Sequence, residues 1–108
     1  MALLISDYQS VLRSFDFTPH WDLPRWGNAL AGEVGELCNI IKKVDRATAA
    51  DPTLEEARDD LGEEIADVIA YAIHLANKAG IDVEQALREK FSKVCSRHAR
   101  FVVNLPEP

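Results

Sequence analysis

Apolar side chains recur every three or four residues in four separate parts of the chain, which is the spacing of one face of an α-helix. The first row predicts a helix from about Ser6 to Phe15, with Ser6 and Gln9 forming a capping box. The second row predicts a long helix from Pro24 to about Arg46, because proline suits the first turn of a helix. No stretch shows the strict alternation of an exposed strand, so the pattern predicts an all-α fold.

Two further helices are predicted in the second half of the chain. The third begins after Asp51, which would cap its amino end, and ends near Ala79, because Gly80 is a common helix terminator. The fourth begins after Asp82, since Gln85 three residues later repeats the capping-box pattern. Four helices in this order are typical of a bundle.

The two longest predicted helices follow one another with a short connection between them. Such helices usually pack as an antiparallel pair. The two shorter helices would cover this pair only in part, so we expect a four-helix-type bundle completed by oligomerisation. Residues 1–108 would form one domain with an extended tail over residues 101–108, in which Phe101 and Val103 pack on a neighbour.

Composition supports a single globular unit and excludes several classes of protein. The chain has 108 residues, of which 47% are hydrophobic, and its formal net charge is -6. An acidic protein is a poor ligand for nucleic acids or anionic membranes. The first ten residues lack the basic region of a secretory signal, and the longest apolar stretch is interrupted by Asp67 and His74, so we expect a cytoplasmic protein. Cys38 and Cys95 lack metal-site spacing and are expected to be buried free thiols.

Two pairs of acidic residues lie beside the apolar rows of the long helices. Glu33 and Glu36 are three residues apart on one helix, and Glu64 and Asp67 repeat this spacing on the next. Residues 36 and 64 are almost equally distant from the turn near Asp51. In an antiparallel pair, the four carboxylates are therefore expected to converge at one height.

Four converging carboxylates repel one another unless they are protonated or a cation compensates their charge. Oxygen ligands favour Mg²⁺ or Mn²⁺ over zinc, and Mg²⁺ commonly also binds substrate phosphates. The alternative is an ordinary solvated face with lysine partners. A ferritin-like di-iron site needs Glu-x-x-His pairs, whereas the positions three residues after Glu33 and Glu64 are Glu36 and Asp67.

Basic and aromatic residues supply candidate ligands for the rest of a phosphorylated substrate. Lys90, Lys93 and Arg97 form one stripe of the fourth helix, and Lys43 follows Glu36 on the second. The alternative for the stripe on the fourth helix is an ordinary solvated face. The alternative for Lys43 is a charge that stabilises the end of its helix. Candidate walls for a base or sugar are His20, Trp21, Trp26 and Tyr71. A core position is the alternative for Trp26, and Tyr71 continues the acidic row.

The segments "GEVGELCNIIKK" and "GEEIADVIAYAIHLANKAGID" resemble the MazG-like all-α nucleoside triphosphate pyrophosphohydrolases. The signature of that family is ExxE, a spacer and ExxD, which here is Glu33, Glu36, Glu64 and Asp67 with 27 residues between the pairs. The resemblance covers about residues 24–98. It implies Mg²⁺-dependent hydrolysis of a nucleoside triphosphate to the monophosphate and pyrophosphate, in removing surplus or damaged nucleotides, by a homodimer or homotetramer.

The same resemblance extends to individual residues outside the acidic pairs. The segment "EKFSKVCSRHARF" resembles the family stretch KFNxVSxR, in which Lys90 and Arg97 match and Ser92 replaces the asparagine. Asn39 would orient a metal ligand or a ribose. Some relatives carry an acid directly before the first glutamate, where this chain has Gly32, so the catalytic base is either Glu36 or Glu63.

Three other functions fit the same residues. Two are close enzymatic relatives, the phosphoribosyl-ATP pyrophosphohydrolase of histidine synthesis and an all-α dUTPase, which use the same acids on other substrates. The third is a non-enzymatic helical interaction module, which predicts no dependence on metal. A deoxyribonucleoside triphosphate is the substrate class that the family resemblance favours.

Overall fold

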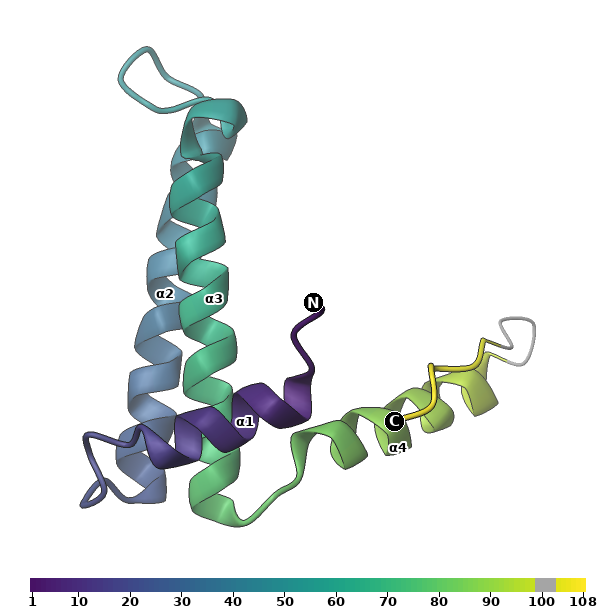
Figure 1. Cartoon of the computed structure of the whole chain (residues 1–108). Helices are drawn as coiled ribbons and strands as arrows, with labels where there is room; N and C mark the ends of the chain where they lie inside the picture. Colours follow the sequence, from purple (N-terminus) through teal and green to yellow (C-terminus); the bar gives the residue numbers. More distant parts are fainter. Residues whose placement is uncertain (99–102) are drawn as a thin grey trace.

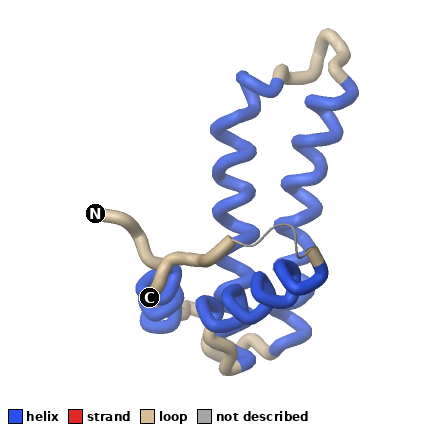
Figure 2. Tube along the Cα trace, turned by 90° about the vertical axis from the view of Figure 1, so that its right-hand side faces the viewer, coloured by secondary structure: helices blue, strands red, loops and turns tan. Residues whose placement is uncertain are grey.

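The computed structural model describes residues 1–98 and 103–108, and every regular element within these ranges is an α-helix. The four helices are α1 (Ile5–Ser14), α2 (Leu23–Arg46), α3 (Leu54–Ala79) and α4 (Val83–Arg97). Helices α2 and α3 form a long antiparallel pair, α1 crosses this pair near one end, and α4 leads away from it (Figure 1). Figure 2 shows the same pair side by side from a second direction. The predicted all-α fold is confirmed.

The amino ends of the two long helices differ slightly from those predicted. Helix α2 begins one residue earlier, at Leu23, and the Asp22 carboxylate accepts a hydrogen bond of 2.9 Å from the Arg25 backbone N–H. Helix α3 is capped by Thr53, whose hydroxyl accepts a bond of 3.2 Å from the Glu56 backbone N–H while the Glu56 carboxylate accepts one from the Thr53 N–H. The predicted cap at Asp51 is therefore wrong.

Asp51 instead closes the turn between the two long helices. Its carboxylate accepts hydrogen bonds from the Arg46 guanidinium and from the backbone N–H of Thr48. The Arg46 guanidinium first, and Thr48 second, hold the pKa of Asp51 well below its usual range. Asp51 thus joins the end of α2 to the turn, and Thr53 is left to begin α3.

The predicted capping box of α1 is wrong. Leu4 precedes the helix and provides no side-chain cap. Gln9 is 4% exposed, and its side chain points into the protein, where it bonds residues 77, 81 and 83. In α4 the cap at Asp82 is as predicted, with a bond of 3.1 Å from the Gln85 N–H, but the Gln85 side chain donates to Glu89 rather than back to the cap.

Both long helices end in a left-handed residue. Gly80 terminates α3 with φ of 71°, which glycine adopts without strain, and this agrees with its predicted role. Helix α2 ends at Ala47 with φ of 52°, where a Cβ atom is unfavourable.

Replacing Ala47 with Gly is expected to stabilise the protein by about 0.5 kcal/mol, because relief of the left-handed strain outweighs the extra freedom of glycine in the unfolded chain. The melting temperature should rise by about 2–4 °C. Ala50→Gly in the same loop is the control, since Ala50 has no positive φ and should gain nothing. A larger gain at position 50 than at position 47 would contradict this explanation.

The core of the single chain is small. Within the described residues, the buried apolar side chains are Trp26, Ala57 and Ile73. The radius of gyration is 17.0 Å, compared with about 13 Å for a compact domain of this length. Large apolar side chains remain exposed on several elements, including Val11, Val34, Ile41, Ile65, Ile69 and Leu87. The chain folded by itself therefore leaves a substantial apolar surface in contact with water.

The two cysteines are free, as predicted, but the prediction that both are buried is wrong. Cys38 is exposed on α2, and Cys95 is half-buried on α4. Its thiol lies 3.9 Å from the carbonyl oxygen of Val103.

The described part of the tail, residues 103–108, has no regular secondary structure. It runs back along α4, where the Arg88 guanidinium donates to the carbonyl oxygen of Pro106. Val103 remains exposed, and Phe101 lies outside the described residues. Among the described helices, none combines the length and the apolar character needed to span a bilayer.

Candidate functional site

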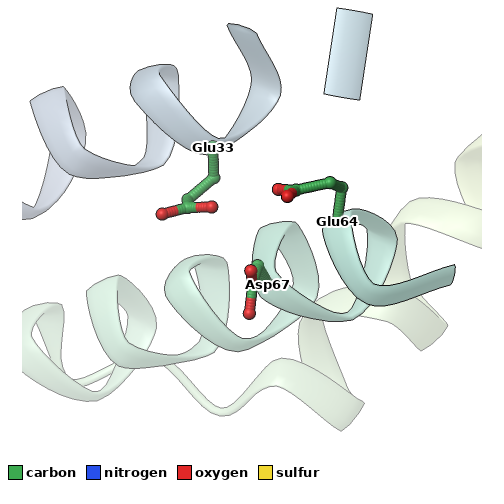
Figure 3. A group of neighbouring side chains, drawn as sticks. All are labelled: Glu33, Glu64 and Asp67. Atoms are coloured by element: carbon green, nitrogen blue, oxygen red, sulfur yellow. The ribbon is translucent and has the colours of Figure 1, made fainter. Parts of the chain in front are cut away.

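Three of the four predicted acidic residues converge between α2 and α3. Glu33 from α2 and Glu64 and Asp67 from α3 each place a carboxylate oxygen within 4.8 Å of the other two. Figure 3 shows Glu33 extending from its helix toward the two residues of the facing helix. Glu33 and Glu64 are half-buried, and Asp67 is exposed. We call these three residues the acidic cluster.

The helix geometry accounts for this convergence. A spacing of three residues places Glu64 and Asp67 on neighbouring turns of one face of α3. The antiparallel arrangement of α2 and α3 brings Glu33 to the same height from the other side of the seam.

The acidic cluster is electrostatically unfavourable without a counter-charge. Burial raises the pKa of Glu33, and the charges of Glu36 and Asp67 raise it further. Burial likewise raises the pKa of Glu64, followed by the charges of the same two residues. Within the described residues, the recorded ion pairs are Arg46 with Asp51 and Arg88 with Glu84, so no lysine or arginine compensates the cluster.

Two buried oxygen atoms in the cluster lack a hydrogen-bond donor. They are Oε2 of Glu33 and Oε2 of Glu64. Buried carboxylate oxygens are normally paired with a donor or a cation. A set of carboxylate oxygens with unfilled coordination suits a hard divalent cation such as Mg²⁺ or Mn²⁺.

The remaining predicted acids lie at the edge of the cluster. Glu36 is exposed and is not one of the three converging ligands, although its side chain is close enough to raise the pKa of both Glu33 and Glu64. Glu63 is exposed and is absent from the groups that perturb either pKa. Of the two candidate bases, only Glu36 is among the charges that act on Glu33 and Glu64.

An aromatic cluster adjoins the acids on the α1 side. Trp26 is 5% exposed, and its ring stacks on His74 with centroids 4.8 Å apart. Trp21 and Tyr71 contact the same ring at 4.6 and 5.8 Å. Trp26 is thus a core residue, whereas Trp21 is half-exposed and carries the Arg25 guanidinium 4.6 Å from its ring centroid.

Tyr71 links the two clusters. Its phenol lies close enough to the Glu33 carboxylate to oppose the rise in the pKa of Glu33. Burial raises the pKa of Tyr71, and the charges of Glu33 and Asp67 add to this effect. Tyr71 therefore belongs to the aromatic cluster and also borders the acidic cluster.

Other predicted substrate ligands lie apart from the acids. His20 and Asn39 are exposed, and within the described residues neither side chain makes a hydrogen bond or ring contact. Lys43 is exposed two turns beyond Glu36 on α2. The basic residues Lys90, Lys93 and Arg97 are exposed on α4, which packs against α1 and diverges from the α2–α3 pair (Figure 1). One chain does not bring its basic stripe to its own acidic cluster.

A small polar pocket next to the aromatic cluster was not predicted. Its lining residues are Leu12 and Arg13 from α1, Asp16 from the following loop, Trp26 from α2, and His74, Asn77 and Lys78 from α3. These residues come from distant parts of the chain, and no local pattern in the sequence connects them. The one feature of the sequence that pointed to this pocket was the continuation of the acidic row through Tyr71 to His74.

Replacing Glu64 with Gln is expected to raise the melting temperature of the metal-free protein at neutral pH. Because the folded-state pKa values of Glu33 and Glu64 are raised, the stability that these groups contribute is present below the unfolded pKa of about 4.3 and is lost as the pH rises through the folded values. In the presence of a chelator, the melting temperature should fall between about pH 5 and about pH 7. This fall should be smaller for Glu64→Gln than for the unsubstituted protein.

The matched control for this prediction is Glu63→Gln, which alters the adjacent exposed carboxylate. Its melting temperature should follow the pH in the same way as that of the unsubstituted protein. Equal effects of the two substitutions would show that the acidic cluster carries no special repulsion.

Comparison with known proteins gives two kinds of match. A sequence model of the MazG nucleotide pyrophosphohydrolase domain matches residues 25–102. Gene 37 protein of Mycobacterium phage L5 is 36% identical over 74 residues, which are 68% of this chain and 64% of that protein. dCTP pyrophosphatase 1 of Mus musculus is 35% identical over 78 residues, which are 71% of this chain and 44% of that protein. The chain thus matches less than two thirds of the length of either relative, and no solved structure matches it.

Proposed function

The chain belongs to the MazG nucleotide pyrophosphohydrolase family, and from this membership we propose that it hydrolyses a nucleoside triphosphate to the monophosphate and pyrophosphate with the help of Mg²⁺. The observation that carries this proposal is the acidic cluster, in which two buried carboxylate oxygens from facing helices lack a donor. A solvated acidic face would not bury carboxylates in this way.

Glu33, Glu64 and Asp67 would hold the cation, with Glu36 beside them. When bound there, Mg²⁺ supplies neutralisation of the phosphate charge and a lowered pKa for water. Tyr71 would support the site from beside Glu33, because its phenol opposes the rise in the pKa of that carboxylate.

The general base is proposed to be Glu36. Its carboxylate is exposed to water and close to both Glu33 and Glu64, whereas Glu63 is not among the charges that act on either residue. Glu36 would accept a proton from the attacking water as the oxygen approaches phosphorus. The negative charge of the pyrophosphate leaving group would be compensated by the proposed phosphate ligands Lys90, Lys93 and Arg97.

The substrate is proposed to be a deoxyribonucleoside triphosphate. The mouse relative is named for dCTP, which makes dCTP the first compound to test. Hydrolysis of surplus or damaged nucleotides in the cytoplasm is the corresponding cellular role.

The phosphate ligands are proposed to come from a second copy of the chain. The single chain exposes 8210 Å², whereas a compact monomer of this size exposes about 6,000 Å². The excess is larger than the roughly 800 Å² that each partner buries in a standard interface. A homodimer or homotetramer that covers the exposed apolar side chains would also allow Lys90, Lys93 and Arg97 of one copy to approach the acidic cluster of another.

The test is a panel of ribo- and deoxyribonucleoside triphosphates incubated with Mg²⁺, with the products identified by chromatography. Monophosphate and pyrophosphate are the expected products. Diphosphate with orthophosphate, or no turnover of any nucleotide, would refute the proposal. Analytical ultracentrifugation of the same sample tests the assembly, for which a monomer at micromolar concentration would be the contrary result.

A further inference from the structure

The small polar pocket beside the aromatic cluster has a volume of about 110 Å³. Ordinary pockets for small molecules hold about 300 Å³ or more. This pocket therefore accommodates one ring of a ligand and not a whole nucleotide. Its walls combine the aromatic side chains of Trp26 and His74 with the cationic side chains of Arg13 and Lys78. Leu12, Asp16 and Asn77 complete the lining.

Arg13 is held in place by an amide network. Asn77 Oδ1 accepts hydrogen bonds from Arg13 Nη2, at 3.1 Å, and from Gln9 Nε2, at 2.9 Å. The Asn77 amide donates to the backbone oxygen of Gln9, and the buried Gln9 side chain also bonds Ile81 and Val83. Every polar atom of the Gln9 side chain is thus engaged, which fixes Asn77 and through it the direction of the guanidinium.

The guanidinium retains donors for a ligand. Arginine carries five N–H donors in a planar fork, and within the described residues the bond to Asn77 is the one that Arg13 makes. Lys78 is already engaged, because its ammonium group donates to the carbonyl oxygen of Pro19 at 3.3 Å. Arg13 is therefore the better placed donor at the pocket.

The pocket lies at the correct distance from the acidic cluster for a nucleobase. Asp67, Tyr71, His74 and Lys78 follow one another along one face of α3 at spacings of four, three and four residues. Seven residues separate Asp67 from His74, which is about 10 Å along a helix. This separation is comparable with the reach of a nucleoside from its phosphate to its base.

We propose that Arg13 is a specificity-determining residue that donates hydrogen bonds to the carbonyl edge of a pyrimidine base lodged in this pocket, with Asn77 and Gln9 as its positioning residues. The proposal rests on the proposed function, because the phosphates must lie at the acidic cluster. The size of the pocket favours a single-ring base, and a guanidinium requires acceptor atoms, which are O2 of any pyrimidine and also N3 in cytosine.

The first experiment compares Arg13→Met with Arg58→Met, an exposed arginine of α3 that lies outside the pocket and the acidic cluster. The substrates are dCTP and a deoxyribose triphosphate that lacks a base. Arg13→Met should lower kcat/KM for dCTP about tenfold or more, mainly by raising KM, and should leave the baseless substrate unaffected. Equal losses on both substrates, or no loss on dCTP, would overturn the proposal, and Arg58→Met should change neither.

The second experiment tests the positioning role of Asn77. Asn77→Asp retains the oxygen that accepts from Arg13, whereas Asn77→Leu removes it. Discrimination between dCTP and the baseless substrate should persist in the first variant and disappear in the second. If both variants lost the discrimination between the two substrates, or if neither lost it, Asn77 would not orient Arg13.

A binding measurement separates this proposal from the proposed function. Deoxycytidine monophosphate is titrated without metal into the unsubstituted protein and into Arg13→Met, and tryptophan fluorescence reports the pocket through Trp26. Binding that Arg13→Met weakens would support the pocket even if no triphosphate is hydrolysed. Hydrolysis by the unsubstituted protein with equal monophosphate binding by both proteins would refute the pocket alone, and no binding by either would also refute it.

Discussion

Asp67→Asn is expected to lower the rate of pyrophosphate release about 10²- to 10³-fold at saturating nucleotide. The substitution removes the charge of one converging ligand while preserving its shape. Because Asp67 is exposed, the fold should persist, and the metal-free protein should melt no lower than the unsubstituted one. Initial rates across a Mg²⁺ titration measure the effect, and the concentration of Mg²⁺ at half-maximal rate should rise.

The matched control is Asp59→Asn on the same helix, since Asp59 is exposed and lies outside the acidic cluster. It should retain the full rate and the same dependence on Mg²⁺. If Asp67→Asn behaved in the same way as Asp59→Asn, the acidic cluster would not be the metal site.

Trp26→Ala should lower the free energy of unfolding by about 3–5 kcal/mol, because it empties the centre of the core. Trp26 is 5% exposed, and removing it leaves a cavity bounded by Trp21, Tyr71 and His74. Domains of this size are stabilised by only about 5–15 kcal/mol, so much of the protein should be unfolded at modest urea concentrations. Urea unfolding followed by circular dichroism measures the change.

Trp21→Ala provides the comparison for Trp26. Trp21 is half-exposed, so its removal should cost about 1 kcal/mol of stability and appear instead as a rise in KM if its free face contacts the nucleoside. Equal destabilisation by the two substitutions would show that Trp26 is not the centre of the core.

The long-range pairing of α2 with α3 could be predicted because it depends on many residues at once. Each helix has a row of apolar side chains several turns long. The predicted packing face therefore stays the same even if one residue of the row is assigned wrongly. The convergence of Glu33 with Glu64 and Asp67 then follows from counting residues on either side of the turn. The end of α3 at Ala79 was predictable from a local signal, the helix-terminating Gly80 that follows it.

Helix caps were harder to predict because several residues near a helix end fit the same pattern. Asp51 and Thr53 both resemble caps, and the choice was decided by the contact of Asp51 with Arg46 and by the reciprocal bonds of Thr53 with Glu56. Gln9 fitted a capping box on α1, but its burial depends on residues of α3 and α4 that no local pattern relates to it.

The direction of α4 also depends on contacts that the sequence does not display. Helical spacing identified its apolar and basic faces but not the surface against which it packs. The structure shows that α4 turns away after Gly80, so the predicted phosphate ligands remain distant from the acids of the same chain. Exposure of Cys38 has a similar origin, because one additional apolar residue in a helix does not reveal which face is covered.

The buried amide of Gln9 has a consequence for how the chain assembles during synthesis. Its hydrogen bonds close loops of 68 to 74 residues, whereas α2 and α3 meet across a short turn. Local contacts form faster than distant ones. The α2–α3 hairpin can therefore form as soon as it leaves the ribosome, and α1 must wait until Ile81 and Val83 have emerged. The helix that is made first therefore reaches its place only after α2 and α3 have been made.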